Sequence, residues 1–226
     1  MMEQRELDQL LEQQTRYYRA RAGTYDLDMA WDSDDPELRG LLEPVEDWFD
    51  DLPIRGQVLE LGCGTGAWTR RLVARSDHVH AIDVAPDMIA LAQGRVGAGD
   101  VTFEVADLFR SKPAAVYDTV FFSFLLTHVP RTLTSPFWQM VASALAEDGT
   151  VAFVDVAPHR HDEEEWSGDG VALWTLRDGS EHRIVKGFPT PDQIVDAMAD
   201  HGIEGTVDVV NDAFLVGVGQ RSASLL

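Results

Sequence analysis

Residues 58–66 read Val58-Leu59-Glu60-Leu61-Gly62-Cys63-Gly64-Thr65-Gly66, and this stretch decides the fold class. A short apolar run with the length of one strand ends in a turn that contains three glycines, and a helical stretch follows. Glycine suits such a turn because it adopts backbone angles that strain other residues and lets a ligand approach the main chain. Amides at the start of the next helix can hold an anionic or polar group. The stretch therefore predicts a ligand-binding strand–turn–helix.

The chain that follows alternates between strand-like and helical segments. Apolar strands that alternate with helices indicate a parallel sheet covered on both faces, which is a doubly wound α/β fold. The strands are expected over residues 57–61, 79–83, 101–105, 118–122 and 150–156, and the helices over residues 66–75, 86–95 and 133–146.

The segments on either side of this region follow other patterns. Two helices are expected over residues 3–22 and 33–50, and the tight-turn pair Asp178-Gly179 predicts a β-hairpin. Thr190 and Gln193 form a capping box for a helix over residues 191–201, and two last strands are expected over 206–210 and 214–219. We therefore expect an N-terminal helical cap or lid over residues 1–52 and an α/β domain over 53–226, in which 159–188 form an inserted hairpin lid over the substrate.

Composition and charge exclude several classes of protein. The chain has 226 residues, of which 39 are acidic and 18 basic, so its net charge is −21 and it would repel a nucleic-acid backbone. No apolar stretch approaches the ~18 residues of a membrane span, and the polar start is not a signal peptide. The single cysteine, Cys63, excludes an internal disulfide and a cysteine-based zinc site. We expect a cytoplasmic protein with no metal and with neither nucleic acid nor membrane as a partner.

Three acidic residues lie at or near the ends of successive predicted strands. Glu60 lies two residues before the first glycine, Asp83 ends the second strand, and Asp107 follows the third. Gly62-x-Gly64-x-x-Ala67 also fits the dinucleotide fingerprint, but carboxylates beside a pyrophosphate would be unfavourable. Asp83 can accept hydrogen bonds from ribose hydroxyls, and Asp107 can accept from an adenine amino group. The three acids favour a positively charged sulfonium nucleoside over a dinucleotide.

These segments together resemble the class I S-adenosylmethionine-dependent methyltransferases, over roughly Tyr17 to Gly219. The resemblance implies a mostly parallel seven-stranded sheet, S-adenosyl-L-methionine as cofactor and S-adenosyl-L-homocysteine as product. The Asn/Asp-Pro-Pro-aromatic motif of many amino-group and nucleic-acid methyltransferases is absent, so a small-molecule member is expected. Besides the glycine turn, the matching segments are residues 81–88, 106–108, 118–124, 126–129 and 145–151, the last with Glu147 and Asp148 where the family has proline and glycine.

The resemblance also implies a role for each matching residue. The glycine turn would line the methionine part of the cofactor, and Asp83 would bind the ribose. The N-terminal segment would fold over the cofactor, where Tyr17 and Tyr25 are candidates for contacts with the cofactor carboxylate. The full set of expected cofactor-binding residues is Tyr17, Tyr25, Glu60, Gly62, Cys63, Gly64, Gly66, Asp83, Val84, Met88, Asp107, Leu108, Ser123 and Phe124.

His128 follows the fourth predicted strand, near the expected position of the methyl group. Its ordinary pKa of about 6.5 suits a general base that takes a proton from a hydroxyl or thiol. The alternative is a histidine that shapes the pocket without taking a proton, because methyl transfer often needs only the alignment of nucleophile, methyl group and sulfur. The histidines and acids of residues 159–165 superficially resemble a metal site, but we expect a solvated loop there.

We therefore expect an enzyme (EC 2.1.1.-) that passes a methyl group from S-adenosylmethionine to an oxygen, sulfur or nitrogen atom of a metabolite. It would work as a monomer or a homodimer. One alternative is a non-catalytic module that binds the nucleoside, and a less favoured one is an NAD(P)-dependent oxidoreductase.

Overall fold

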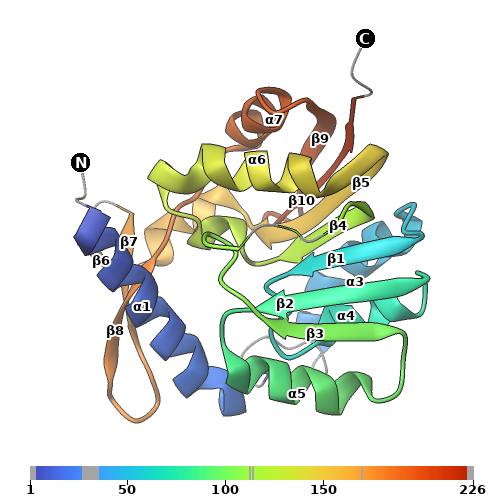
Figure 1. Cartoon of the computed structure of the whole chain (residues 1–226). Coiled ribbons are helices and arrows are strands. Elements are labelled where there is room, and N and C mark those ends of the chain that lie inside the picture. Colours follow the sequence, from blue (N-terminus) through green and yellow to red (C-terminus); the bar gives the residue numbers. More distant parts are fainter. Residues whose placement is uncertain (1–3, 27–35, 112, 114, 169, 223–226) are drawn as a thin grey trace.

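The computed structural model describes residues 4–26, 36–111, 113, 115–168 and 170–222, which form two sheets and their helices (Figure 1). The larger sheet has seven strands in the order β3-β2-β1-β4-β5-β10-β9, and the smaller has three in the order β6-β7-β8. Neighbours in the larger sheet are parallel, except that β10 runs antiparallel to β5 and β9. The strands are β1 Gln57–Leu61, β2 His78–Asp83, β3 Val101–Val105, β4 Tyr117–Ser123, β5 Leu145–Val156, β6 Trp166–Gly168, β7 Val171–Thr175, β8 Glu181–Val185, β9 Ile203–Val210 and β10 Phe214–Arg221.

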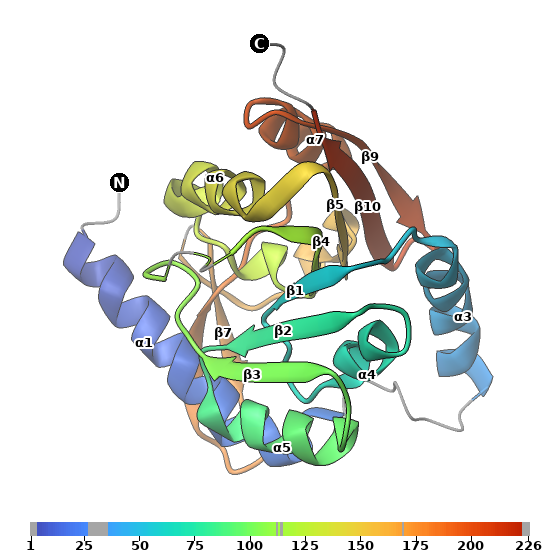
Figure 2. The ribbon, with the colours of Figure 1, turned by 45° about the vertical axis from the view of Figure 1, so that its right-hand side comes forward.

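Helices cover both faces of the seven-stranded sheet (Figures 1 and 2). Side chains alternate along a strand, so Leu59 and Leu61 pack with α6 and α7, whereas Val58 packs with α3, α4 and α5. The α-helices are α1 Gln4–Arg21, α3 Pro36–Asp51, α4 Ala67–Val73, α5 Pro86–Val96, α6 Thr134–Ala144 and α7 Pro191–Ala199. The short 3₁₀ helices are η1 Ala22–Thr24, η2 Leu126–His128, η3 Arg131–Leu133 and η4 Pro158–Glu163.

The predicted fold class, a doubly wound and mostly parallel seven-stranded sheet, is confirmed. The capping box of Thr190 and Gln193 at the start of α7 is also confirmed. The helix expected over residues 133–146 instead ends at Ala144, because buried Leu145 already pairs with Tyr117 of β4. The predicted helix start at Ser33 lies outside the described residues.

Helix α1 packs on the three-stranded sheet, and both lie beyond the carboxyl ends of β1, β2 and β3 (Figure 1). Strands β7 and β8 are the two arms of the predicted hairpin, and β6 adds a third strand that the sequence did not indicate. Leu10 of α1 is buried against Val171 and Val185, and the Gln14 side-chain oxygen accepts a hydrogen bond from the Val185 amide at 3.0 Å. In the described parts of the chain, no helix combines the length and the apolar character that crossing a membrane requires.

Candidate functional site

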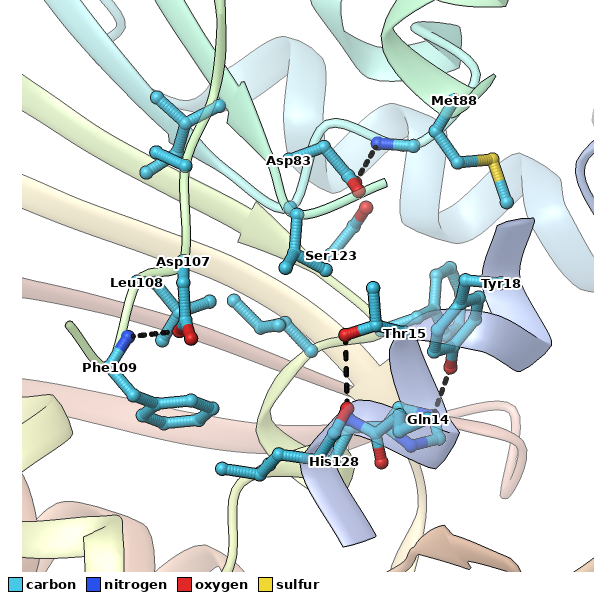
Figure 3. Close-up of a pocket in the computed structure, with 18 of the residues that line it drawn as sticks. Gln14, Thr15, Tyr18, Asp83, Met88, Asp107, Leu108, Phe109, Ser123 and His128 are labelled. Carbon is cyan, nitrogen blue, oxygen red and sulfur yellow. Dashed lines mark hydrogen bonds between the residues drawn. The ribbon is translucent and has the colours of Figure 1, made fainter. Parts of the chain in front are cut away.

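A cavity of about 100 Å³ lies between the carboxyl ends of the central strands and α1 (Figure 3). It opens where the strand order reverses between β1 and β4, which is the usual ligand-binding position in doubly wound sheets. Its volume is below the ~300–1,000 Å³ of typical small-ligand pockets. The cavity is lined by Leu11, Gln14, Thr15, Tyr18, Tyr25, Gly62, Gly64, Ile82, Asp83, Val84, Met88, Ala106, Asp107, Leu108, Phe109, Ser123, Phe124, Leu125 and His128.

The glycines after β1 differ in what surrounds them. Gly64 has φ +53°, and a Cβ added there would meet nothing within 4 Å, so its backbone borders open space in the cavity wall. Gly66 has φ +82° and caps α4, where a Cβ would lie 2.9 Å from the Cα of Ala92 in α5. Gly64 therefore leaves room for a ligand, whereas Gly66 allows two helices to approach closely.

Asp83, at the end of β2, points its carboxylate toward the glycine turn (Figure 3). One carboxylate oxygen accepts from the Gly64 amide at 2.9 Å, and the other accepts from the Ala85 amide at 2.8 Å. Burial raises the pKa of Asp83, while these two amides act in the opposite direction. Each oxygen keeps a further lone pair, so the carboxylate can also accept from the hydroxyls of a ligand.

Asp107 and Phe124 border the cavity from neighbouring loops. Asp107 accepts a hydrogen bond from the Phe109 amide at 2.9 Å, which closes a tight turn after β3. Phe124 follows β4 with φ +49°, an unusual conformation for a bulky residue that costs about 1–3 kcal/mol. Its amide donates to the Val154 carbonyl at 2.8 Å, which helps to hold it in place. Strain of this kind is concentrated at functional sites.

His128, in η2, is buried in the cavity wall beside Tyr18 of α1 (Figure 3). Its Nε2 lies 3.0 Å from the Tyr18 hydroxyl oxygen, and its Nδ1 lies 2.9 Å from the Val185 carbonyl oxygen. Burial, and after it the charge of Lys186, lowers the pKa of His128 well below its usual value. The imidazole is therefore neutral near neutral pH, the form in which it can accept a proton.

Comparison with known proteins identifies the family. Residues 58–149 match the family described as a methyltransferase domain. The chain is 30% identical over 163 residues to the 2-heptyl-1-hydroxyquinolin-4(1H)-one methyltransferase of Mycobacteroides abscessus, an alignment that covers 66% of this chain and 69% of that enzyme. It is 38% identical to the protein in the solved DhpI–SAH complex, with a TM-score of 0.83 and coverage of 94% and 97% of the two chains. The chain belongs to the class I S-adenosylmethionine-dependent methyltransferases.

Other similarities are local. The malonyl-[acyl-carrier protein] O-methyltransferase of Bacillus cereus is 41% identical over 66 residues, which are 28% of this chain and 24% of that enzyme. The alignment thus spans about a quarter of that relative. The expected cofactor, S-adenosylmethionine, is confirmed by the similarity to a complex with its demethylated product.

The chemistry of the cavity wall fits S-adenosylmethionine. Asp83 offers carboxylate oxygens for ribose hydroxyls, Asp107 offers them for an adenine amino group, and Gly64 leaves open space beside the backbone. Eleven of the fifteen residues predicted from the sequence line the cavity. These are Tyr25, Gly62, Gly64, Asp83, Val84, Met88, Asp107, Leu108, Ser123, Phe124 and His128.

The four remaining predicted residues, Tyr17, Glu60, Cys63 and Gly66, do not line the cavity. The Glu60 carboxylate is buried on the far side of the glycine turn, where it accepts from the Thr69 hydroxyl at 2.6 Å, and burial raises its pKa to about 8. Cys63 is buried against the α4 side of the sheet, and burial raises the pKa of its thiol. Tyr17 lines a separate groove of about 670 Å³ between α1 and β7. Their roles in cofactor binding stay predictions.

Sequence reasoning expected the N-terminal segment to fold over the cofactor, but it did not single out the residues of α1 that line the cavity. Leu11, Gln14, Thr15 and Tyr18 all line the cavity. Residues separated by three or four positions share one face of a helix, so this spacing was a signal that could have found the group. Only the resemblance to the family indicated that this segment would lie over the cofactor.

A buried polar network behind η2 was also missed. Asp155 of β5 accepts from the Thr127 amide at 3.2 Å and from the Thr127 hydroxyl at 2.9 Å. The Lys186 ammonium donates to the same hydroxyl at 3.4 Å, and the Gly187 amide donates to the Thr127 carbonyl at 2.8 Å. Burial raises the pKa of Asp155, and the charge of Lys186 opposes that rise. The network ties η2, and with it His128, to β5 and to the end of β8.

Proposed function

We propose that this methyltransferase transfers the methyl group of S-adenosylmethionine to an oxygen, sulfur or nitrogen nucleophile of a small molecule. The observation that carries the proposal is the closure of the cavity, since α1 lies across the strand ends and leaves a small space. Among the described residues no lysine or arginine lines that space, and its titratable side chains are Asp83, Asp107, Tyr18, Tyr25 and His128.

The name of one relative and the charge of the chain support a small acceptor. The M. abscessus relative, which supports this proposal, is named for a hydroxyquinolinone, whereas the B. cereus relative is named for a malonyl group on a carrier protein. Another relative is named a ribosomal RNA methyltransferase. The net charge of −21 argues against RNA, because a polyanion gains affinity mainly from lysines and arginines on the protein.

In the proposed reaction the chain contributes binding, alignment and exclusion of water. S-adenosylmethionine supplies a methyl carbon bonded to a positively charged sulfur. Asp83 and Asp107 would hold the nucleoside, and Ser123 and Phe124 would border the reacting end. Alignment of the nucleophile with the methyl carbon is the largest expected contribution to the rate. His128 is the candidate acceptor for the proton that the nucleophile releases.

Two measurements test the proposal. Calorimetry is expected to show binding of S-adenosylhomocysteine and no binding of NAD. A panel of hydroxyl, thiol and amine compounds is then incubated with S-adenosylmethionine, and at least one is expected to accelerate release of S-adenosylhomocysteine. Binding of the nucleoside without turnover on any compound would favour the non-catalytic alternative instead.

A further inference from the structure

The contacts of His128 assign its protons. Nδ1 faces the Val185 carbonyl oxygen, and a carbonyl oxygen can only accept, so Nδ1 carries the hydrogen. In a neutral imidazole the other nitrogen then has a lone pair, so Nε2 accepts the hydrogen of the Tyr18 hydroxyl. The three groups form a chain in which Tyr18 donates to His128 and His128 donates to Val185.

The surroundings keep both side chains of this chain neutral. Burial raises the pKa of the Tyr18 hydroxyl well above its usual value, and burial and the Lys186 charge lower the pKa of His128. The positive charge of Arg21 in α1 lowers the pKa of both groups, so it disfavours protonation of His128 and partly offsets the effect of burial on Tyr18. The negative charge of Asp155 in β5 raises the pKa of Tyr18. The aromatic rings of Tyr17 and Trp174 lie against Tyr18 and His128 respectively.

The hydrogen bond between Tyr18 and His128 determines which of the two side chains is available to the methyl acceptor. Both residues line the cavity, but the Nε2 lone pair of His128 is already engaged by Tyr18. The Tyr18 oxygen uses its hydrogen in that bond and keeps lone pairs of its own. We infer that Tyr18 is a catalytic residue that receives the proton of the acceptor and passes its own proton to His128. The inference rests on the proposed function and deepens it, because it names the route by which the proton leaves.

The step balances in atoms and charge. The acceptor atom bonds to the methyl carbon while the carbon–sulfur bond breaks, and its electron pair stays on sulfur. The acceptor proton moves to the Tyr18 oxygen as the Tyr18 proton moves to Nε2 of His128. The positive charge on sulfur disappears as one appears on the imidazole, so the site keeps its net charge. For a hydroxyl or a thiol a weak base is sufficient, because the proton of the acceptor becomes strongly acidic as the new bond forms.

The relay also restricts the acceptor. It serves a hydroxyl or a thiol, each of which must lose a proton when it is methylated, and it can also take the proton of a neutral amine that is released as a neutral product. A carboxylate or another acceptor that is already ionised has no proton to give to Tyr18. The inference therefore names neutral, proton-bearing nucleophiles as the substrate class.

The activity test compares two substitutions that each remove one hydroxyl from a tyrosine–histidine pair. Tyr18→Phe removes the proposed relay, whereas Tyr117→Phe removes the hydroxyl that lies 2.7 Å from Nδ1 of His80. Tyr117 is the first residue of β4, at the amino end of that strand and away from the cavity. With the best hydroxyl compound of the panel, Tyr18→Phe is expected to lower kcat about 100-fold and to leave affinity for S-adenosylhomocysteine within about threefold. Tyr117→Phe is expected to keep kcat. An unchanged kcat in Tyr18→Phe would refute the relay.

A second readout needs no acceptor and separates the relay from the proposed function. Nitrogen NMR of histidine-labelled protein bound to S-adenosylhomocysteine is expected to show a neutral His128 protonated at Nδ1, with the signal assigned by its loss in His128→Gln. Tyr18→Phe is expected to shift the Nε2 resonance, and Tyr117→Phe is expected to leave it in place. A ring protonated at Nε2, or an Nε2 resonance unmoved by Tyr18→Phe, overturns the relay even if no panel compound is methylated.

Discussion

The glycine turn after β1 has a cavity side and an interior side, and the residues on the two sides differ in their surroundings. Gly64 and the Asp83 carboxylate bonded to its amide border the cavity. Glu60 and Gly66 face the interior, where one contacts Thr69 and the other lies against α5. The resemblance to a family suggested a contact with the cofactor for all four. In the structure Glu60 and Gly66 make interior contacts and Asp83 and Gly64 border the cavity, so we expect the first pair to affect stability and the second pair to affect binding.

The largest expected effect is on the interior side, at Glu60. Its pKa of about 8 in the folded protein lies above the unfolded value of 4.5, so its contribution to stability is fully present below pH 4.5 and is lost as the pH rises through 8. Glu60→Gln removes this titration and keeps an acceptor for Thr69. At about pH 8.5 the variant is expected to exceed the wild type in free energy of unfolding by on the order of 4 kcal/mol, a difference that shrinks toward acid pH.

Urea unfolding at several pH values measures this difference. Glu147→Gln, at an exposed acid, is the matched control and is expected to follow the wild type at each pH. If Glu60→Gln shows the pH dependence of the wild type, the Glu60 carboxylate is not held neutral in the interior.

The next effect separates the two glycines. Gly66→Ala is expected to lower the free energy of unfolding by about 3 kcal/mol, because strain at a positive φ adds to a collision with the backbone of Ala92. Gly64→Ala has the strain without the collision, so about 1 kcal/mol is expected, together with about tenfold weaker binding of S-adenosylhomocysteine. Urea unfolding and calorimetry of both variants provide the test. If Gly64→Ala lost more stability than Gly66→Ala, and Gly66→Ala bound S-adenosylhomocysteine more weakly than Gly64→Ala, the cavity side and the interior side of the turn would be assigned wrongly.

On the cavity side, Asp83→Asn is expected to weaken binding of S-adenosylhomocysteine about 30-fold, because the ribose hydroxyls lose a charged acceptor. Asp118→Asn is the matched control, since Asp118 also accepts from a backbone amide, that of Gln57 at 2.8 Å, but at the other end of the strands. Calorimetry is expected to give the control the affinity of the wild type. Equal affinities in all three proteins would show that the ribose does not contact Asp83.

The smallest effect is expected on the surface of α1. Arg19 forms an ion pair with Asp87 at 2.8 Å, and about half of each side chain is exposed to solvent. Exposed pairs contribute less than about 1 kcal/mol, so Arg19→Ala is expected to change affinity for S-adenosylhomocysteine by less than about threefold. A tenfold loss in calorimetry would mean that this pair, rather than the buried contacts of Leu10 and Tyr18, holds α1 over the cavity.

The sequence by itself determined the local elements of this protein. Glycines after an apolar strand, a capping box at Thr190 and alternating apolar runs specify turns, helix starts and strands through interactions between near neighbours. From these the order of strands and helices followed, and with it the fold class and the carboxyl-end position of Asp83 and Asp107.

Tertiary structure decided which of these residues meet. The Tyr18–His128 contact joins positions 110 apart, and the bond from Lys186 to Thr127 joins positions 59 apart. Whether Glu60 faces a ligand or Thr69 depends on how β1 packs against α4, and whether α1 closes the cavity depends on its packing against β8. The local conformational preferences of the residues do not predict contacts between positions so far apart in the sequence. These contacts form only when separate elements bury their apolar faces together.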